Sequence, residues 1–247
     1  MVLRRIIGCL GLATGFLWGA EDYWAFAPVS NSTPPTVGNS NWAREDLDRF
    51  VLAGIEKGGY LPTKTAEKRT LVRRAYLDLH GLPPTAAQIT SFLEDEREDA
   101  WEKLIGELLE SPRYGERWGR HWLDVARYAD TNGMDEDIAH PSAWRYRDYV
   151  IAAFNEDKPF DQFIIEQLAG DLLPAKDLEE KRARTVGLGF LSVGPKMLAC
   201  DDPDKMRRDI VDEQMDTMGR AFLGMTIGCA RCHDHKIDPI SIKDYYG

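Results

Sequence analysis

Cysteine and histidine are scarce in this chain, with 4 cysteines and 5 histidines among 247 residues. A zinc site made of two cysteine pairs is therefore not expected. Besides Cys229 and Cys232 the chain has only Cys9, in an N-terminal apolar segment, and Cys200, which is distant in sequence. No segment alternates apolar and polar residues as a β-strand does, and no internal repeat is present. Neither a nucleophile–base pair nor a phosphate-binding loop is present, which lowers the expectation of an enzyme.

Basic residues are also in short supply, since 31 lysines and arginines face 41 acidic residues and leave a net charge of −10. A nucleic-acid partner is not expected, because phosphate-binding proteins normally carry a basic face. The charge permits a basic partner protein, for example another electron carrier. Net charge alone does not identify such a redox partner.

No apolar run is long enough to span a membrane comfortably. The longest, 6–18, follows Arg4 and Arg5 and ends at the small residues Gly19 and Ala20. This pattern predicts a signal peptide over 1–20 that is cleaved after Ala20. Trp18 is bulky for a position so close to a cleavage site, so an uncleaved N-terminal membrane anchor is the alternative. We therefore expect a periplasmic or cell-surface protein.

The rest of the chain predicts a mainly α fold. Residues 21–41 are rich in Pro, Ser, Thr, Asn and Gly, which indicates an extended arm. From 42 to 247 apolar residues recur at helical spacing, and Thr85 with Gln88 forms the pattern of a capping box. Further predicted helices follow the same periodicity; they are 44–57, 100–110, 144–154, 160–172, 177–190 and 203–223.

The most specific motif is Cys229-x-x-Cys232-His233. Two thiols separated by two residues can add to the two vinyl groups of one haem, and the following imidazole can bind its iron. The motif therefore predicts covalently attached haem c, with His233 as an iron ligand.

Three other interpretations of this motif stay open. The pair could be a redox dithiol, although no strand precedes it. It could bind a metal without haem, together with His233 or His235. Finally, Cys229 and Cys232 could form a structural disulfide.

Six segments of the chain carry a family resemblance. They are LHGLPPT at 79–85, YGERW at 114–118, HWLDVARYAD at 121–130, AWRYRDYV at 143–150, QLAGDLLP at 167–174 and GCARCHDHKIDP at 228–239. Together they resemble the second type of planctomycete-specific cytochrome c-type domain, a family without an established activity. The resemblance implies a multi-helix domain over 42–247, not the small cytochrome c fold, and haem bound through Cys229, Cys232 and His233. Members usually continue further, so it also implies a C-terminal domain missing from this chain.

The sixth iron ligand has two candidates. His121 ranks first, because it lies among Trp118, Trp122 and Val125 at helical spacing and is expected to point inward. A buried histidine held by hydrogen bonds is the competing interpretation. Met197 ranks second.

Other residues have candidate roles near the haem. Arg145 and Arg147 could bind the propionates, or equally form surface salt bridges with neighbours such as Asp148. His235 is too close to His233 to bind the opposite face of the haem, but it could bind another metal or a propionate. Cys200 is expected to be a free or intermolecular thiol.

We therefore expect an exported c-type haem-binding protein that acts in electron transfer. One alternative is a periplasmic haem oxidoreductase, or a metal-dependent enzyme with an open coordination position. The other is a non-catalytic surface interaction domain with a Cys229–Cys232 disulfide.

Overall fold

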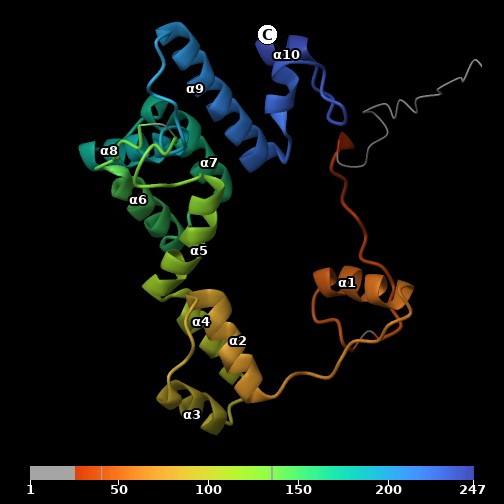
Figure 1. Ribbon diagram of the computed structural model, residues 1–247. Helices are drawn as coiled ribbons and strands as arrows, with labels where there is room; N and C mark the ends of the chain where they lie inside the picture. The colour runs from red at the N-terminus through yellow and green to blue at the C-terminus, as the bar shows by residue number, and fades with distance from the viewer. Residues whose placement is uncertain (1–25, 40, 135) are drawn as a thin grey trace, which may run out of the picture. The chain divides into compact units, whose positions relative to one another are not determined.

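The structure, a computed structural model, describes residues 26–39, 41–134 and 136–247 (Figure 1). The predicted leader at 1–20 lies outside these residues. In the described part regular structure is helical, and one isolated antiparallel bridge joins Thr131 to Ala139. The mainly α fold is therefore confirmed.

The helices follow the predicted order with small shifts at their ends. The α-helices are α1 (Asp46–Lys57), α2 (Lys68–His80), α3 (Ala86–Glu94), α4 (Ala100–Leu109), α5 (Pro112–Val125), α6 (Ala143–Asn155), α7 (Phe160–Ala169), α8 (Leu178–Gly187), α9 (Pro203–Met218) and α10 (Ile242–Tyr246). The 3-10 turns are η3 (Gly170–Leu172), η4 (Leu188–Leu191) and η6 (Ile227–Arg231), and a π-helical turn, η5 (Gly219–Leu223), extends α9. None of the helices in the described ranges is both long and apolar enough to cross a membrane.

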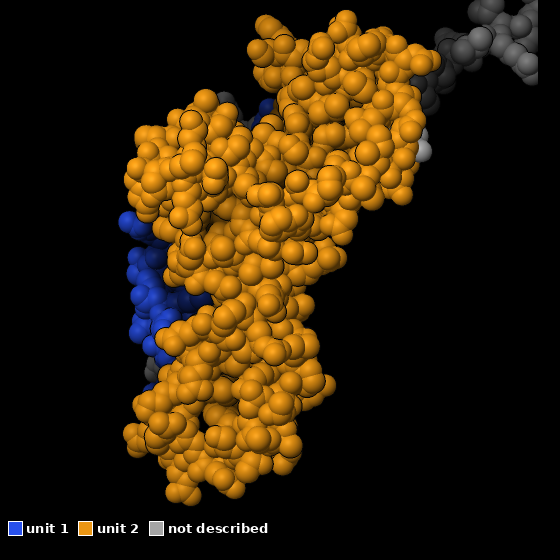
Figure 2. Space-filling model, turned by 90° about the vertical axis from the view of Figure 1, so that its left-hand side faces the viewer, with its two compact units in different colours: residues 1–63, 237–239 blue, residues 64–236, 240–247 orange. Residues whose placement is uncertain are grey.

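The chain divides into two compact units, which Figure 2 colours separately. The first comprises residues 1–63 with 237–239, and its described part holds α1 and the arm before it. The arm is bonded to α1 through the Glu56 carboxylate, which accepts hydrogen bonds from the backbone N–H groups of Gly38 and Asn39 at 3.1 and 3.3 Å. Helix α1 thus groups with the arm, whereas the predicted helical domain begins at residue 42.

The second unit, residues 64–236 with 240–247, contains two hydrophobic clusters. The first cluster lies among α2, α3 and α4, and its buried members are Val72, Ala75, Tyr76, Phe92, Ala100, Leu104 and Leu108. The predicted capping box begins α3, since the Gln88 N–H donates to Thr85 Oγ1 at 3.3 Å and the Thr85 N–H donates to Gln88 Oε1 at 2.8 Å.

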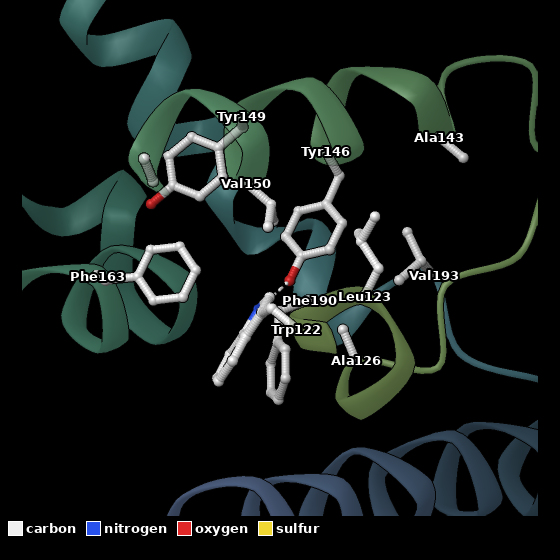
Figure 3. Packing of buried hydrophobic residues seen from close by; sticks show 11 residues of the cluster. Trp122, Leu123, Ala126, Ala143, Tyr146, Tyr149, Val150, Phe163, Phe190 and Val193 are labelled. Carbon is white, nitrogen blue, oxygen red and sulfur yellow. Dashed lines mark hydrogen bonds between the residues drawn. The ribbon is translucent and has the colours of Figure 1, made fainter. Parts of the chain in front are cut away.

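The second cluster surrounds Trp122 of α5 and draws on α6, α7 and η4 (Figure 3). The indole N–H of Trp122 donates to Gln167 Oε1 at 2.9 Å and lies 3.0 Å from the Tyr146 hydroxyl. Helices α5 and α6 can approach closely because position 115 is glycine. A Cβ there would lie 2.5 Å from the Ile151 carbonyl oxygen.

Candidate functional site

The cysteine motif lies on η6 and the turn after it, next to α9. The Gly228 N–H donates to Asp216 Oδ1 of α9 at 3.0 Å. A Cβ at Gly228 would lie 2.8 Å from the same oxygen, so a side chain there would displace the Asp216 carboxylate. The start of the motif is therefore packed directly on the acidic side of α9.

The two residues between the cysteines hold the segment in place. Ala230 is fully buried. The guanidinium of Arg231 contacts two carboxylates of α9, with Nη2 at 2.8 Å from Asp209 Oδ1 and Nε at 2.9 Å from Asp212 Oδ2. The hydrogen bond to Asp209 and the charge of Asp212 raise the pKa of Arg231, which stays cationic. Sequence reasoning missed both roles, because the haem motif leaves these two positions unspecified.

Helix α10 adds two hydrogen bonds, one to Asp212 and one to the Arg231 backbone. The Tyr245 hydroxyl donates to Asp212 Oδ1 at 2.5 Å, and the Tyr246 hydroxyl donates to the Arg231 carbonyl oxygen at 3.1 Å. Burial, and then the bond to Asp212, raise the pKa of Tyr245, so this hydroxyl stays protonated and can donate. Helices α9 and α10 thus hold the middle of the motif together.

The cysteine thiols themselves face solvent. Cys229 and Cys232 are both exposed and both free, and Cys200 is a free, half-buried thiol next to α9. The thiol of Cys200 lies 3.4 Å from the Asp202 carbonyl oxygen. The geometry therefore presents Cys229 and Cys232 outward from a buried alanine and an ion-paired arginine.

His233 is exposed, and its hydrogen bond indicates its tautomer. Ring nitrogen Nδ1 lies 2.8 Å from the Asp234 carbonyl oxygen. Because a carbonyl can only accept, Nδ1 carries the proton in that contact, and the neutral ring keeps a lone pair on Nε2. This is the form in which an imidazole binds a metal through Nε2.

His235 has contacts of its own within the loop. Its Nε2 lies 2.8 Å from Thr226 Oγ1, and its backbone N–H donates to the Ile240 carbonyl oxygen at 2.8 Å. These bonds connect the two sides of the loop. The predicted roles of His235 toward a second metal or a propionate stay predictions.

His121 does not point inward, so that expectation was wrong. Its side chain is exposed on α5 and contacts the ring of Trp118, with centroids 5.4 Å apart. The neighbouring Trp122 and Leu123 occupy the buried side of the helix instead. An inward histidine was the reason for ranking His121 first as the sixth ligand, and that reason is removed.

Met197 shares a pocket with one residue of the cysteine motif. It lines a space of about 420 Å³ together with Arg231, Asp209 and Glu213. The role of Met197 as sixth ligand stays a prediction.

Arg145 and Arg147 are exposed on α6 and make local contacts. The Arg145 guanidinium lies 4.9 Å from the centroid of the Trp144 ring, and Arg147 Nη2 lies 2.8 Å from Asp148 Oδ1. Surface contacts of this kind are the alternative that the sequence offered to propionate binding. The pocket beside Cys229 is lined by other residues.

That pocket has a volume of about 390 Å³ and is rich in carboxylates. Its lining residues are Asp209, Asp212, Glu213, Asp216, Arg220, Gly228, Cys229, Arg231 and Tyr245. Arg220 is paired with Asp216, with Nε 2.7 Å from Oδ2. Across the described ranges, no group of three or more His, Cys, Asp or Glu side chains is placed to hold a metal ion.

The fold and site define a helical protein that presents a Cys-x-x-Cys-His segment from the side of one long helix. The chain belongs to the PSCyt2 family, described as a protein of unknown function (DUF1549), whose model matches residues 46–247. No curated protein and no solved structure matches the chain.

Proposed function

We propose that this protein is an exported c-type cytochrome that carries electrons, with haem c bound through Cys229, Cys232 and His233. The observation that carries the proposal is that the two middle residues of the motif are fixed in the fold while its two cysteines are not. Ala230 is buried and Arg231 is ion-paired with α9, and the two thiols are left free and exposed. A closed zinc site would have no need for both thiols to face solvent.

The residues fit covalent haem attachment. Both thiols are accessible to a porphyrin edge, and the two residues between them give the spacing that the vinyl groups require. His233 has Nε2 available as the iron ligand, because Nδ1 is engaged by the Asp234 carbonyl. When bound, the haem would supply a one-electron redox couple.

The surroundings favour electron transfer over chemistry in a closed pocket. The space beside Cys229 measures about 390 Å³ and is bordered by carboxylates, and both cysteines are exposed, so the attachment site lies at the surface. A redox group attached there would be accessible to a partner protein. The carboxylates of α9 would favour a partner with a basic surface.

Export belongs to the same proposal, because c-type haem is attached outside the bacterial cytoplasm. The predicted leader at 1–20 would supply the export signal. A cytochrome c-type assignment and a planctomycete origin for this family are likewise part of the proposal, and rest on the motifs at 79–85, 114–118, 121–130, 143–150, 167–174 and 228–239.

A second candidate is a non-catalytic interaction domain with a Cys229–Cys232 disulfide. It draws on the same observation, since two exposed thiols three residues apart are open to oxidation as well as to haem.

One experiment separates the two candidates. The full chain is produced with its leader alongside a cytochrome c maturation system, denatured, separated by electrophoresis and stained for haem. We expect the stain to stay with the chain, and the Cys229→Ala/Cys232→Ala double variant to lose it. Cys200→Ala is the matched control and should keep the stain.

An unstained chain whose mass is two hydrogens below that of the reduced protein would contradict the cytochrome proposal and support the disulfide. Haem that is bound but lost on denaturation would also contradict covalent attachment.

A further inference from the structure

A small pocket lies among α5, α6 and α7, away from the cysteine motif. Its volume is about 200 Å³, below the roughly 300–1,000 Å³ of sites for larger ligands. Its lining residues are Tyr114, Trp122, Ala153, Phe154, Asp157, Lys158, Phe160 and Phe163. Five of these eight side chains are aromatic, so the pocket suits a compact group that prefers ring surfaces.

The aromatic rings that line the pocket contact one another at steep angles. Trp122 meets Phe160 at 84° and Phe163 at 67°, with centroids 6.4 and 5.0 Å apart. Phe154 meets Phe163 at 65° with centroids 6.1 Å apart. Figure 3 shows the Trp122 indole beside the Tyr146 hydroxyl, and the bonds from its N–H to Tyr146 and Gln167 fix the position of this ring.

The charges at the pocket favour a cation. Asp157 lines it with an exposed carboxylate and lies two residues after Asn155, which ends α6, where the helix dipole is negative. The one cationic residue of the lining, Lys158, is already paired, with Nζ 2.6 Å from Glu166 Oε2 and 4.9 Å from the Tyr149 ring centroid. The charge of Lys158 is therefore largely balanced by a carboxylate outside the lining.

Asp157 occupies the left-handed backbone position that follows α6, with φ at 48°, and aspartate adopts this region more readily than most residues. The Lys158 N–H donates to the Ala153 carbonyl oxygen at 3.0 Å and closes this helix end. The turn brings the Asp157 carboxylate to the pocket.

We propose that this pocket binds a small free quaternary ammonium ion of the choline type. Aromatic faces attract a cation through their negative quadrupole, and a trimethylammonium group has no N–H that would need an acceptor among those rings. A primary ammonium would lose hydrogen bonds to water there without replacement. The carboxylate of Asp157 also disfavours a ligand with its own acid group next to the cation.

Choline and its neutral isostere 3,3-dimethylbutan-1-ol test the proposal, because they share a shape and differ in charge. Binding to the full chain is followed by calorimetry and by the NMR signal of the Trp122 indole N–H. We expect choline to shift this signal and to bind about threefold to tenfold more tightly than the alcohol, as expected for a cation–ring contact that keeps some exposure to water.

Two variants should weaken choline binding by about threefold to tenfold. Phe160→Ala removes one ring, and Phe160 is 62% exposed, so the fold should tolerate the change. Asp157→Asn removes the charge, and asparagine accepts the left-handed backbone. The matched controls Ile165→Ala and Asp161→Asn lie on the same helix, α7, outside the lining, and should leave binding unchanged.

Three results would overturn the proposal. Equal affinity for choline and the alcohol would make the pocket a general apolar site. Binding to phosphatidylcholine vesicles without binding to free choline would assign it to a membrane surface. Absence of saturable binding by either probe, in a protein whose control variants are folded, would leave the pocket as packing space.

Discussion

The core around Trp122 and the segment around Cys229 both depend on polar contacts, but these are buried in the core and exposed in the cysteine segment. In the core, polar groups bond to one another inside the cluster, as Trp122 does with Gln167. In the cysteine segment, Arg231 bonds outward to Asp209 and Asp212 of α9. The bonds of Trp122 stabilise a buried core, whereas the ion pairs of Arg231 stabilise a segment at the surface.

This difference separates the residues that stabilise the fold from those available for chemistry. Glu166 is 2% exposed and is held by Lys158, Gln162 and Tyr149, so its carboxylate is committed to structure. Cys229 and Cys232 are exposed and free. Substitutions in the two regions should therefore be distinguishable by which property they change.

The largest expected effect comes from Trp122→Ala. It should lower the free energy of unfolding by about 3–5 kcal/mol, because a buried indole and its hydrogen bond are lost. Trp118→Ala on the same helix is the control, since Trp118 is 37% exposed, and it should cost clearly less. Urea unfolding followed by circular dichroism measures both. Equal losses would show that the Trp122 cluster is not the core of this unit.

A smaller effect is expected from Glu166→Gln, about 2 kcal/mol at neutral pH, because hydrogen bonds to a charged group are lost. Burial alone would raise the pKa of Glu166, but bonds from Lys158, Gln162 and Tyr149 outweigh it and lower the pKa below the ordinary 4.5. The stabilisation is therefore complete above about pH 4.5 and disappears as the pH falls through the lowered pKa.

The pH dependence of unfolding checks this sign. The variant should lose part of the acid-side slope that the unmodified protein shows, so that the two curves converge at low pH. Glu179→Gln, an exposed carboxylate at the start of α8, should leave the slope nearly unchanged. Parallel curves for the Glu166 variant and the unmodified protein would contradict a lowered pKa.

The smallest effect is local and belongs to the cysteine segment. Asp216→Ala removes the acceptor of the Gly228 N–H, a hydrogen bond worth about 1 kcal/mol. Hydrogen exchange at the Gly228 amide should become about fivefold faster, while core amides such as that of Val150 keep their rates. A uniform change across both regions would show that the segment and the core open together.

Much of the fold could be predicted because its signals are local. Thr85 and Gln88 define the start of α3 through contacts three residues apart, and Ser111 with Pro112 marks the boundary between α4 and α5. The cysteine motif is equally local. The widening of α9 into the π turn at 219–223 could not be seen, because the same apolar spacing continues through it.

The orientation of α5 could not be predicted for a different reason. His121 and Trp122 are neighbours in a stripe of large rings, and helical spacing alone fits either of them as the buried residue. The choice depends on partners distant in sequence, namely Gln167, Phe190 and Phe222. The part played by Arg231 depends in the same way on carboxylates about twenty residues earlier.

Helix α5 contacts α2 and α4 of the first cluster as well as α6 of the second (Figure 1). It supplies Trp122 and Leu123 to one core, while Arg117 lies against Gly81 at the end of α2. If either cluster came apart, α5 would lose part of the packing that holds it in position. The other cluster would then lose support as well, because it also packs on α5. In thermodynamic terms the two clusters share one cooperative unit, and a ligand that binds against α5 would raise the stability of both.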